Sequence, residues 1–131
     1  MERKIVLLLA AVLVFGVAAY GHHSLAALYD ESKSVKIDGK VVQFSFRSPH
    51  SFVAIEAPDD KGKVQRWAVT WSAAAALARS GITRDFFKIG DRIIITGNPG
   101  RNAEDHAIKM VTLSRPSDGF SWGTAAGERV D

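Results

Sequence analysis

The stretch that decides the fold is Val35-Lys36-Ile37-Asp38-Gly39-Lys40-Val41-Val42-Gln43-Phe44-Ser45-Phe46. Val35 and Ile37 alternate with polar residues, and Val42 and Phe44 do so again further along. A period of two is typical of a β-strand with one buried face. The alternation changes phase between Gly39 and Val42, which requires an extra residue in the strand. The sequence therefore predicts one long strand with a bulge or sharp bend near Gly39.

Four more segments carry strand patterns, separated by turn and loop signals. They cover residues 52–57, 64–71, 92–97 and 107–113. Ser48-Pro49-His50 ends the first strand, and residues 58–63 combine proline, aspartate and glycine in a pattern typical of a turn. Residues 98–106 are predicted to form a polar loop.

The period changes between the third and fourth strands, where a short helix is expected. Ser72 is a suitable N-cap, residues 73–80 are rich in alanine, and Gly81 stands where a helix C-terminal glycine belongs. Residues 83–87 are expected to form a second short turn that directs two phenylalanines into the core.

The order of elements is three strands, a short helix and two strands, so the fold class is all-β with one short helix. A long bent first strand that serves both halves of a sheet predicts a five-stranded OB-like Greek-key barrel. A three-stranded meander with a separate hairpin is the alternative, but barrel closure is favoured because it removes exposed edges. Residues 116–131 are polar and contain glycine, with Phe120 and Trp122 isolated, and are expected to form a flexible or weakly attached tail.

The first residues of the chain have the pattern of a secretory signal. A basic start at residues 1–4 precedes an uncharged, almost wholly apolar run at residues 5–20, which is followed by small residues. A membrane-spanning helix needs about 20 apolar residues, and this run is shorter. Cleavage is expected after Ala19 or Gly21. We therefore predict a signal peptide at 1–21, a barrel domain at 22–115, a periplasmic location, and membrane contact only through the uncleaved signal.

Composition restricts the chemistry further. The chain has no cysteine, which excludes disulfides, thiolate ligands and cysteine nucleophiles. It carries 17 Lys and Arg against 14 Asp and Glu, and these charges are interspersed along the chain. A basic stretch of the kind that contacts phosphates is missing from the sequence, so nucleic acid is not an expected partner.

Several short motifs together resemble one family of proteins. They are His22-His23-Ser24-Leu25-Ala26-Ala27, Tyr29-Asp30, Ser48-Pro49-His50, Trp67-Ala68-Val69, Ala76-Leu77-Ala78-Arg79, Gly81-Ile82-Thr83-Arg84-Asp85 and Gly90-Asp91. In order and spacing they are similar to the domain-of-unknown-function 6152 family, a group of small exported bacterial proteins. The likeness covers roughly residues 22–115, with Leu25 in place of the usual Phe and Ser48 in place of Asn. The resemblance implies a periplasmic OB-like barrel and brings no established activity.

The four histidines, His22, His23, His50 and His106, form the first candidate site. Neutral imidazole is a common transition-metal ligand. Cleavage after Gly21 would let the amine and ring nitrogen of His22 chelate one ion, and cleavage after Ala19 would place His22 third from the terminus. Both arrangements permit Cu(II) binding, so copper is the cofactor that this hypothesis names. The alternative is that these histidines are solvated or belong to turns.

The second candidate site is a ligand face made of Arg47, Arg66, Trp67 and Trp71. Aromatic and cationic residues on a barrel strand are typical of OB-type binding surfaces. The favoured alternative is that Trp67 and Trp71 share one strand face with Val69 and fill the core.

Catalysis has little support in the sequence. Ser24, Ser51 and Ser72 lie outside any nucleophile motif, and no glycine-rich loop suits a phosphate. We therefore expect an exported binding module without catalytic activity, whose partner is a small ligand, a metal ion or a periplasmic protein. A copper-binding protein is the first alternative and a periplasmic hydrolase the second.

Overall fold

The computed structural model describes residues 25–131 of the protein. The predicted signal peptide and the predicted metal ligands His22 and His23 lie outside the described residues. Within residues 25–131, no helix has the length and apolar character needed to span a membrane. The elements run in the order β1 (Val35–Ser45), β2 (Phe52–Pro58), β3 (Val64–Thr70), α2 (Ala74–Arg79), β4 (Arg92–Pro99), η1 (Ala103–Asp105), β5 (Ala107–Arg115) and β6 (Phe120–Trp122).

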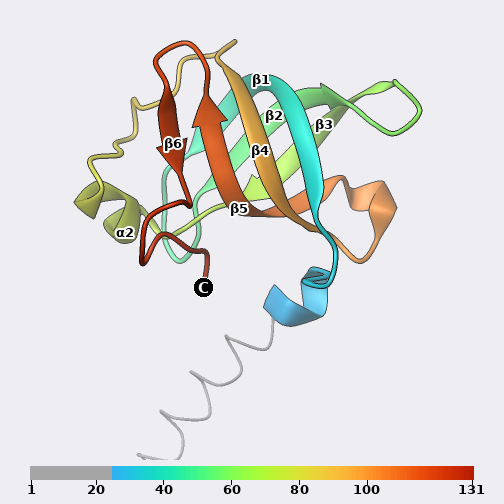
Figure 1. Cartoon of the computed structure of the whole chain (residues 1–131), viewed down its shortest axis with the longest axis horizontal. Coiled ribbons are helices and arrows are strands. Elements are labelled where there is room, and N and C mark those ends of the chain that lie inside the picture. Colours follow the sequence, from blue (N-terminus) through green and yellow to red (C-terminus); the bar gives the residue numbers. More distant parts are fainter. Residues whose placement is uncertain (1–24) are drawn as a thin grey trace, which may run out of the picture.

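The strands form one sheet that closes on itself (Figure 1). Their order is β3-β2-β1-β4-β5-β6, and β3 also pairs with β5 in parallel, so the first five strands make a closed barrel. The mostly β architecture with one short helix is thus confirmed. A separate hairpin is excluded, because β4 pairs with β1 from Arg92 opposite Lys40 to Gly97 opposite Val35.

β1 contains the irregularity that the phase change predicts. Ile37, Gly39 and Val41 point inward, and the pairing with β2 then shifts register between Val41 and Gln43. The bulge is therefore confirmed, although it lies at Val42 rather than at Gly39, and Val41 is the residue that packs in the core. Glycine is needed at position 39 for a different reason: the strand backbones approach closely there, and a Cβ would lie only 2.5 Å from the Glu56 carbonyl oxygen.

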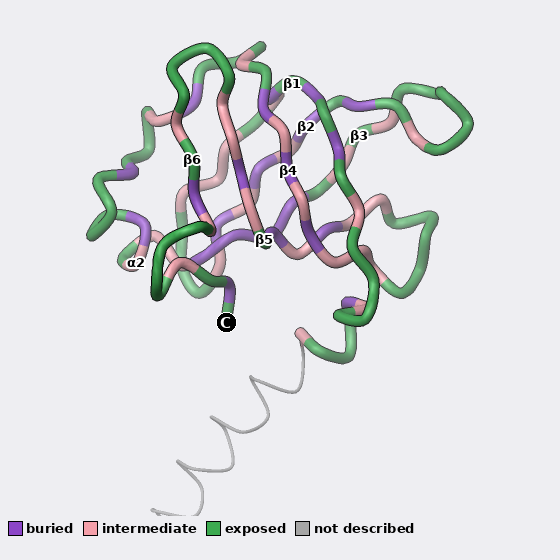
Figure 2. Tube along the Cα trace, viewed as in Figure 1, coloured by how far each residue is buried: buried purple, intermediate pink, exposed green. Residues whose placement is uncertain are grey.

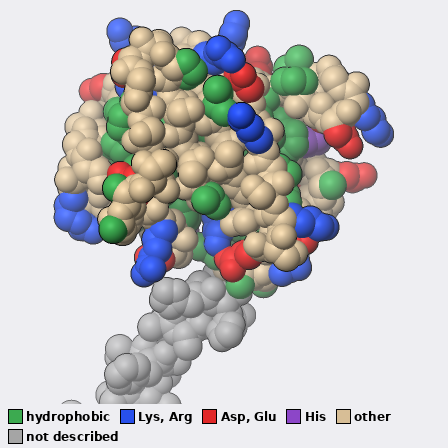
Figure 3. Space-filling view, viewed as in Figure 1, with side chains coloured by type: hydrophobic (Ala, Val, Ile, Leu, Met, Phe, Trp, Pro, Cys, Tyr) green, Lys and Arg blue, Asp and Glu red, His purple; other side chains and the backbone are tan. Residues whose placement is uncertain are grey.

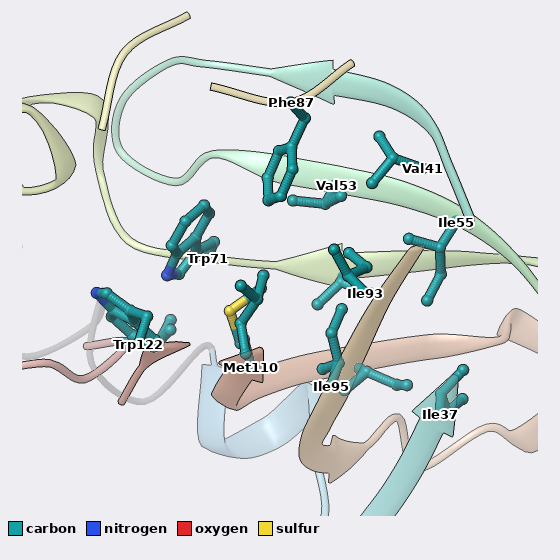
Figure 4. Packing of buried hydrophobic residues seen from close by; sticks show 14 of the residues in the cluster. Ile37, Val41, Val53, Ile55, Trp71, Phe87, Ile93, Ile95, Met110 and Trp122 are labelled. Atoms are coloured by element: carbon teal, nitrogen blue, oxygen red, sulfur yellow. The ribbon is translucent and has the colours of Figure 1, made fainter. Parts of the chain in front are cut away.

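The barrel interior is filled by aliphatic side chains and, at one end, by aromatic side chains (Figure 4). Buried positions recur along the barrel strands (Figure 2). The aliphatic side chains include Ile37, Ile55, Ile93 and Ile95. The aromatic group, which we call the closed end, consists of Phe44, Phe46, Trp71, Phe86, Phe87, Phe120 and Trp122. Trp71 is wholly buried and packs edge-on against Trp122 with ring centroids 5.4 Å apart.

α2 differs from its sequence prediction at the start and agrees with it at the end. Ala73, not Ser72, is the N-cap, because the Ser72 hydroxyl donates instead to the Arg129 carbonyl at 2.9 Å. At the other end Gly81 has a φ of +77°, and Ile82 N–H donates to the Leu77 carbonyl at 3.0 Å. This is the Schellman arrangement in which glycine ends a helix.

The C-terminal segment corrects the predicted domain boundary at residue 115. β6 pairs with the end of β5, and Trp122 and Val130 belong to the buried core. Arg115 holds this segment, since its guanidinium donates to Asp118 and to the Phe86 carbonyl and lies 4.3 Å from the Phe86 ring centroid. The packed domain therefore extends well beyond residue 115 instead of ending in a flexible tail.

Candidate functional site

The end of the barrel opposite the closed end carries a groove. In Figure 1, α2 and β6 lie on the left, whereas the β2–β3 hairpin and η1 lie on the right. The hairpin, β3 and the β4–β5 connection line a hollow of about 620 Å³, which we call the mouth groove. Its half-buried floor is made by Val35, Asp59, Gln65, Trp67, Pro99, Gly100, His106 and Ala107. Its exposed rim is made by Lys33, Asp60, Lys61, Arg101, Asn102, Ala103 and Glu104.

Trp67 and His106 meet on the floor of the mouth groove. Their rings are nearly perpendicular, at 86°, with centroids 4.9 Å apart. The Trp67 indole N–H donates to the Ala57 carbonyl at 3.2 Å, which fixes the ring against β2. The polar edge of Trp67 is thus satisfied by the protein, and an apolar aromatic surface remains toward the groove.

Backbone geometry positions His106. It caps η1 in the left-handed region with a φ of 45°, a conformation that few residues other than glycine adopt. Its carbonyl accepts a hydrogen bond from Ala68 N–H at 2.9 Å, next to Trp67 on β3. Asn102 stabilises the same turn, because its side chain accepts from Glu104 N–H and donates to Asp105.

Asp59 organises the hairpin that forms one wall of the mouth groove. Its Oδ1 accepts the backbone N–H groups of Lys61 and Lys63, each at 2.9 Å. Its Oδ2 accepts from the Gln65 side-chain amide at 3.1 Å. The Gln65 hydrogen bond, followed by the two backbone bonds and the nearby His106, lowers the pKa of the Asp59 carboxyl below its ordinary value of 3.8. The carboxylate form therefore fixes both the hairpin and Gln65.

Charges of both signs surround the mouth groove. Lys33, Lys61 and Arg101 are its basic residues, and the acidic residues are Asp59, Asp60 and Glu104. The face of the molecule shown in Figure 3 has the same character, since Lys and Arg side chains are interspersed with Asp and Glu. The lining is thus balanced in formal charge when His106 is neutral.

The barrel separates the two predicted metal ligands that the structure describes. His106 lines the mouth groove, whereas His50 lines a smaller hollow of about 380 Å³ between α2 and the C-terminal segment. The His50 Nδ1 is buried there without a hydrogen-bond partner. No group of three or more His, Asp or Glu side chains between residues 25 and 131 is arranged to hold a metal ion. His22 and His23 lie outside these residues.

The predicted ligand face is also divided. Trp71 is a core residue with no exposed surface, as the alternative interpretation expected. Arg66 lies on the outer side of β3 and donates to the Gln43 side chain at 2.8 Å. Arg47 stands near the end of β1 with its guanidinium 4.9 Å from the Phe52 ring centroid. Of the four residues, Trp67 alone lines the mouth groove.

Sequence reasoning missed most of the residues that surround Trp67. Asp59 and Lys61 were assigned to a turn, and Arg101 and Asn102 to a polar loop. The one available signal was the Asp59-Asp60-Lys61-Gly62 composition, which indicates a side-chain-stabilised turn but not what the turn faces. The pairing of β3 with β5 brings the turn and the loop to one groove.

Comparison with known proteins gives one result. A search of curated proteins and a search of solved structures find no match. The model of one protein family, a family of unknown function called DUF6152, matches residues 10–109, which is most of the chain. The protein therefore belongs to the DUF6152 family, as its short motifs predicted.

Proposed function

We propose that this protein is an exported, OB-like binding module without catalytic activity, and that it binds a small molecule in the mouth groove. The observation that carries the proposal is the Trp67–His106 pair on the floor of a hollow of about 620 Å³. Ligand sites are concave, partly aromatic, and common in the mouths of β-barrels. OB-folds in particular bind ligands with strands 2 and 3 and with the loops between strands 1 and 2 and between strands 4 and 5. Of these elements, β3 and the β4–β5 connection line this groove.

The groove is better suited to binding than to catalysis. Among the described residues that line it, none carries a hydroxyl or a thiol that could act as a nucleophile. His106 is close enough to Asp59 to contribute to the lowered pKa of the Asp59 carboxyl. Both carboxylate oxygens of Asp59, however, already accept hydrogen bonds from the hairpin. An Asp59–His106 relay would require those bonds to break.

The copper alternative is weakened within the described residues, because His50 and His106 line different hollows. It then depends on His22 and His23. Isothermal titration with Cu(II) of the exported protein and of its His22→Ala, His23→Ala variant separates the two functions. The binding-module proposal expects the wild type to bind Cu(II) no more tightly than this variant does. Markedly tighter Cu(II) binding by the wild type would favour the copper alternative.

The proposed site is tested by screening a small-molecule fragment library with saturation-transfer NMR, using protein expressed from the full sequence. Three proteins are compared: wild type, Trp67→Leu and Arg66→Ala. Arg66 is the matched control because it neighbours Trp67 on β3 but points outward. We expect a set of fragments that bind wild type and Arg66→Ala but not Trp67→Leu. If Trp67→Leu kept every fragment, the groove would not be the site.

Export is tested separately from binding. The full chain is expressed in a Gram-negative host, the cells are fractionated, and the N-terminal residue of the product is determined. The proposal expects a periplasmic product that begins at Tyr20 or His22. An intact chain in the cytoplasm would contradict it.

A further inference from the structure

We infer that the ligand of the mouth groove is a neutral oligosaccharide. This inference rests on the proposed function and narrows it to one chemical class. Three properties of the groove support it: its charge balance, the aromatic surface of its floor, and the mixture of hydrogen-bonding groups on its rim.

The charge balance opposes an ionic ligand. Three basic and three acidic side chains line the groove, so any net charge on a ligand would approach like charges on the rim. Lys33 is already paired with Asp30 at 3.2 Å, which reduces the positive charge available to an anion. A neutral ligand avoids this repulsion.

Part of the floor is apolar, since Val35, Trp67 and Pro99 contribute to it. The Trp67 N–H is used by the Ala57 carbonyl, so the indole contributes ring surface to the groove and no free donor. A pyranose ring has one face of C–H groups that packs on such a surface and is otherwise covered with hydroxyls. A wholly apolar ligand would make no use of the hydrogen-bonding groups on the rim.

The rim matches hydroxyl groups, which donate and accept hydrogen bonds at once. Lys61 and Arg101 supply donors, while Asp60 and Glu104 supply acceptors, and all four are exposed. On the floor, the Gln65 Nε2 is held by Asp59, and the Gln65 side-chain oxygen accepts no hydrogen bond from the described residues. Gln65 is therefore positioned as an acceptor beside Trp67, two residues away on the same strand face.

The dimensions agree with a short oligosaccharide. A hollow of about 620 Å³ lies within the range of small-molecule sites. A single-stranded nucleic acid would also stack on Trp67 and His106, but its phosphates need a net positive groove. The balanced lining therefore favours sugar over nucleic acid.

Isothermal titration of the purified protein with maltotriose, cellotriose and chitotriose tests the inference. We expect saturable binding of at least one of them, weakened about tenfold or more by Trp67→Leu. Gln65→Ala should weaken the same sugar, and it provides a second variant if Trp67→Leu is poorly folded. Arg66→Ala should bind like wild type. Trigalacturonate, which has the same number of rings but three carboxylates, should bind more weakly than the neutral sugars.

The outcomes separate this inference from the proposed function. If no neutral trisaccharide bound at about 10 mM while other fragments bound in a Trp67-dependent way, the sugar assignment would be wrong and the groove would remain a binding site. Preferential binding of oligothymidylate or trigalacturonate would have the same meaning. If neither sugars nor fragments depended on Trp67, both proposals would be overturned.

Discussion

The two ends of the barrel use tryptophan in different ways. At the closed end, Trp71 and Trp122 are buried and pack edge-on against each other among five phenylalanines. At the mouth, Trp67 is half-buried, its N–H is satisfied by a backbone carbonyl, and its ring meets His106. Trp67 and Trp71 nevertheless come from the same region of the chain, since Trp67 lies on β3 and Trp71 directly follows this strand.

Under the proposed function, one stretch of chain, β3 and the residue that follows it, would serve stability at one end and binding at the other. At the closed end, α2 and the C-terminal segment help to bury Trp71, Phe87 and Trp122, while the other four aromatic rings of the cluster are half-buried. The mouth has a hairpin and a loop beside it but nothing over it within residues 25–131, and it remains a groove. Substitutions at the closed end should therefore affect unfolding, and those at the mouth should affect binding.

The largest effect on stability is expected from Trp71→Ala. Removing a fully buried indole should lower the free energy of unfolding by about 3–5 kcal/mol, whereas Trp67→Ala should lower it by only about 1–2 kcal/mol. Urea denaturation followed by circular dichroism measures both. Equal losses for the two variants would remove the distinction between the ends.

The next effect concerns the attachment of the C-terminal segment to the closed end. Arg115→Met keeps the aliphatic stem but loses the bonds to Asp118 and to the Phe86 carbonyl, which should cost about 2–3 kcal/mol. Arg92→Met is the matched control, because the Arg92–Asp38 pair is largely exposed and is expected to contribute little to stability. A similar loss for both arginines, measured by urea denaturation, would show that the segment is held by other contacts.

A smaller effect is expected where the N-terminal part of the described chain joins the barrel. The Tyr29 hydroxyl and the Thr70 hydroxyl share a buried hydrogen bond of 2.7 Å. Tyr29→Phe should cost about 1–2 kcal/mol, because it leaves the Thr70 hydroxyl without this partner. In a double-mutant cycle, Thr70→Val should then add little to Tyr29→Phe. If the stability losses of Tyr29→Phe and Thr70→Val were fully additive, the two hydroxyls would not be hydrogen-bonded to each other.

The smallest effect on global stability, but a clear local one, is expected at the mouth. Because the pKa of Asp59 is lowered on folding, its contribution is complete above its ordinary value of 3.8 and is lost as the pH falls through the lowered pKa. Asp59→Asn should remove this pH dependence and weaken the bonds to the Lys61 and Lys63 amides. Hydrogen exchange of these amides should be faster in the variant. Unchanged exchange would mean that the hairpin does not depend on the carboxylate.

Most of the barrel was predictable because its signals are local and repeated. Short strand patterns, which alternate clearly in the first and third strands, predict the five barrel strands. The phase change predicts the bulge in β1, and Gly81 predicts the end of α2. β6 was not predictable, since three residues are too few to show a period and its partners lie on β5. Ser72 was assigned to the helix cap because its competing partner, the Arg129 carbonyl, is 57 residues away in the chain.

The candidate site was predictable only in part. Trp67 was identified by residue type, but it was grouped with Arg66 and Trp71. Arg66 is its neighbour on β3 and therefore points to the opposite side of the sheet. Trp71 lies four residues further along the chain and is buried at the closed end. His50 and His106 were grouped because both are histidines, and the barrel places them in different hollows. The mouth groove depends on the parallel pairing of β3 with β5, which no local pattern encodes.

The most direct test of the two-ended account follows the three tryptophan indole N–H signals by ¹H–¹⁵N NMR while the neutral trisaccharides are added. The chain has three tryptophans, so each end has its own reporter. The account predicts that the Trp67 signal shifts with saturation, while the Trp71 and Trp122 signals stay in place. A shift at Trp71 or Trp122 with an unchanged Trp67 signal would contradict it.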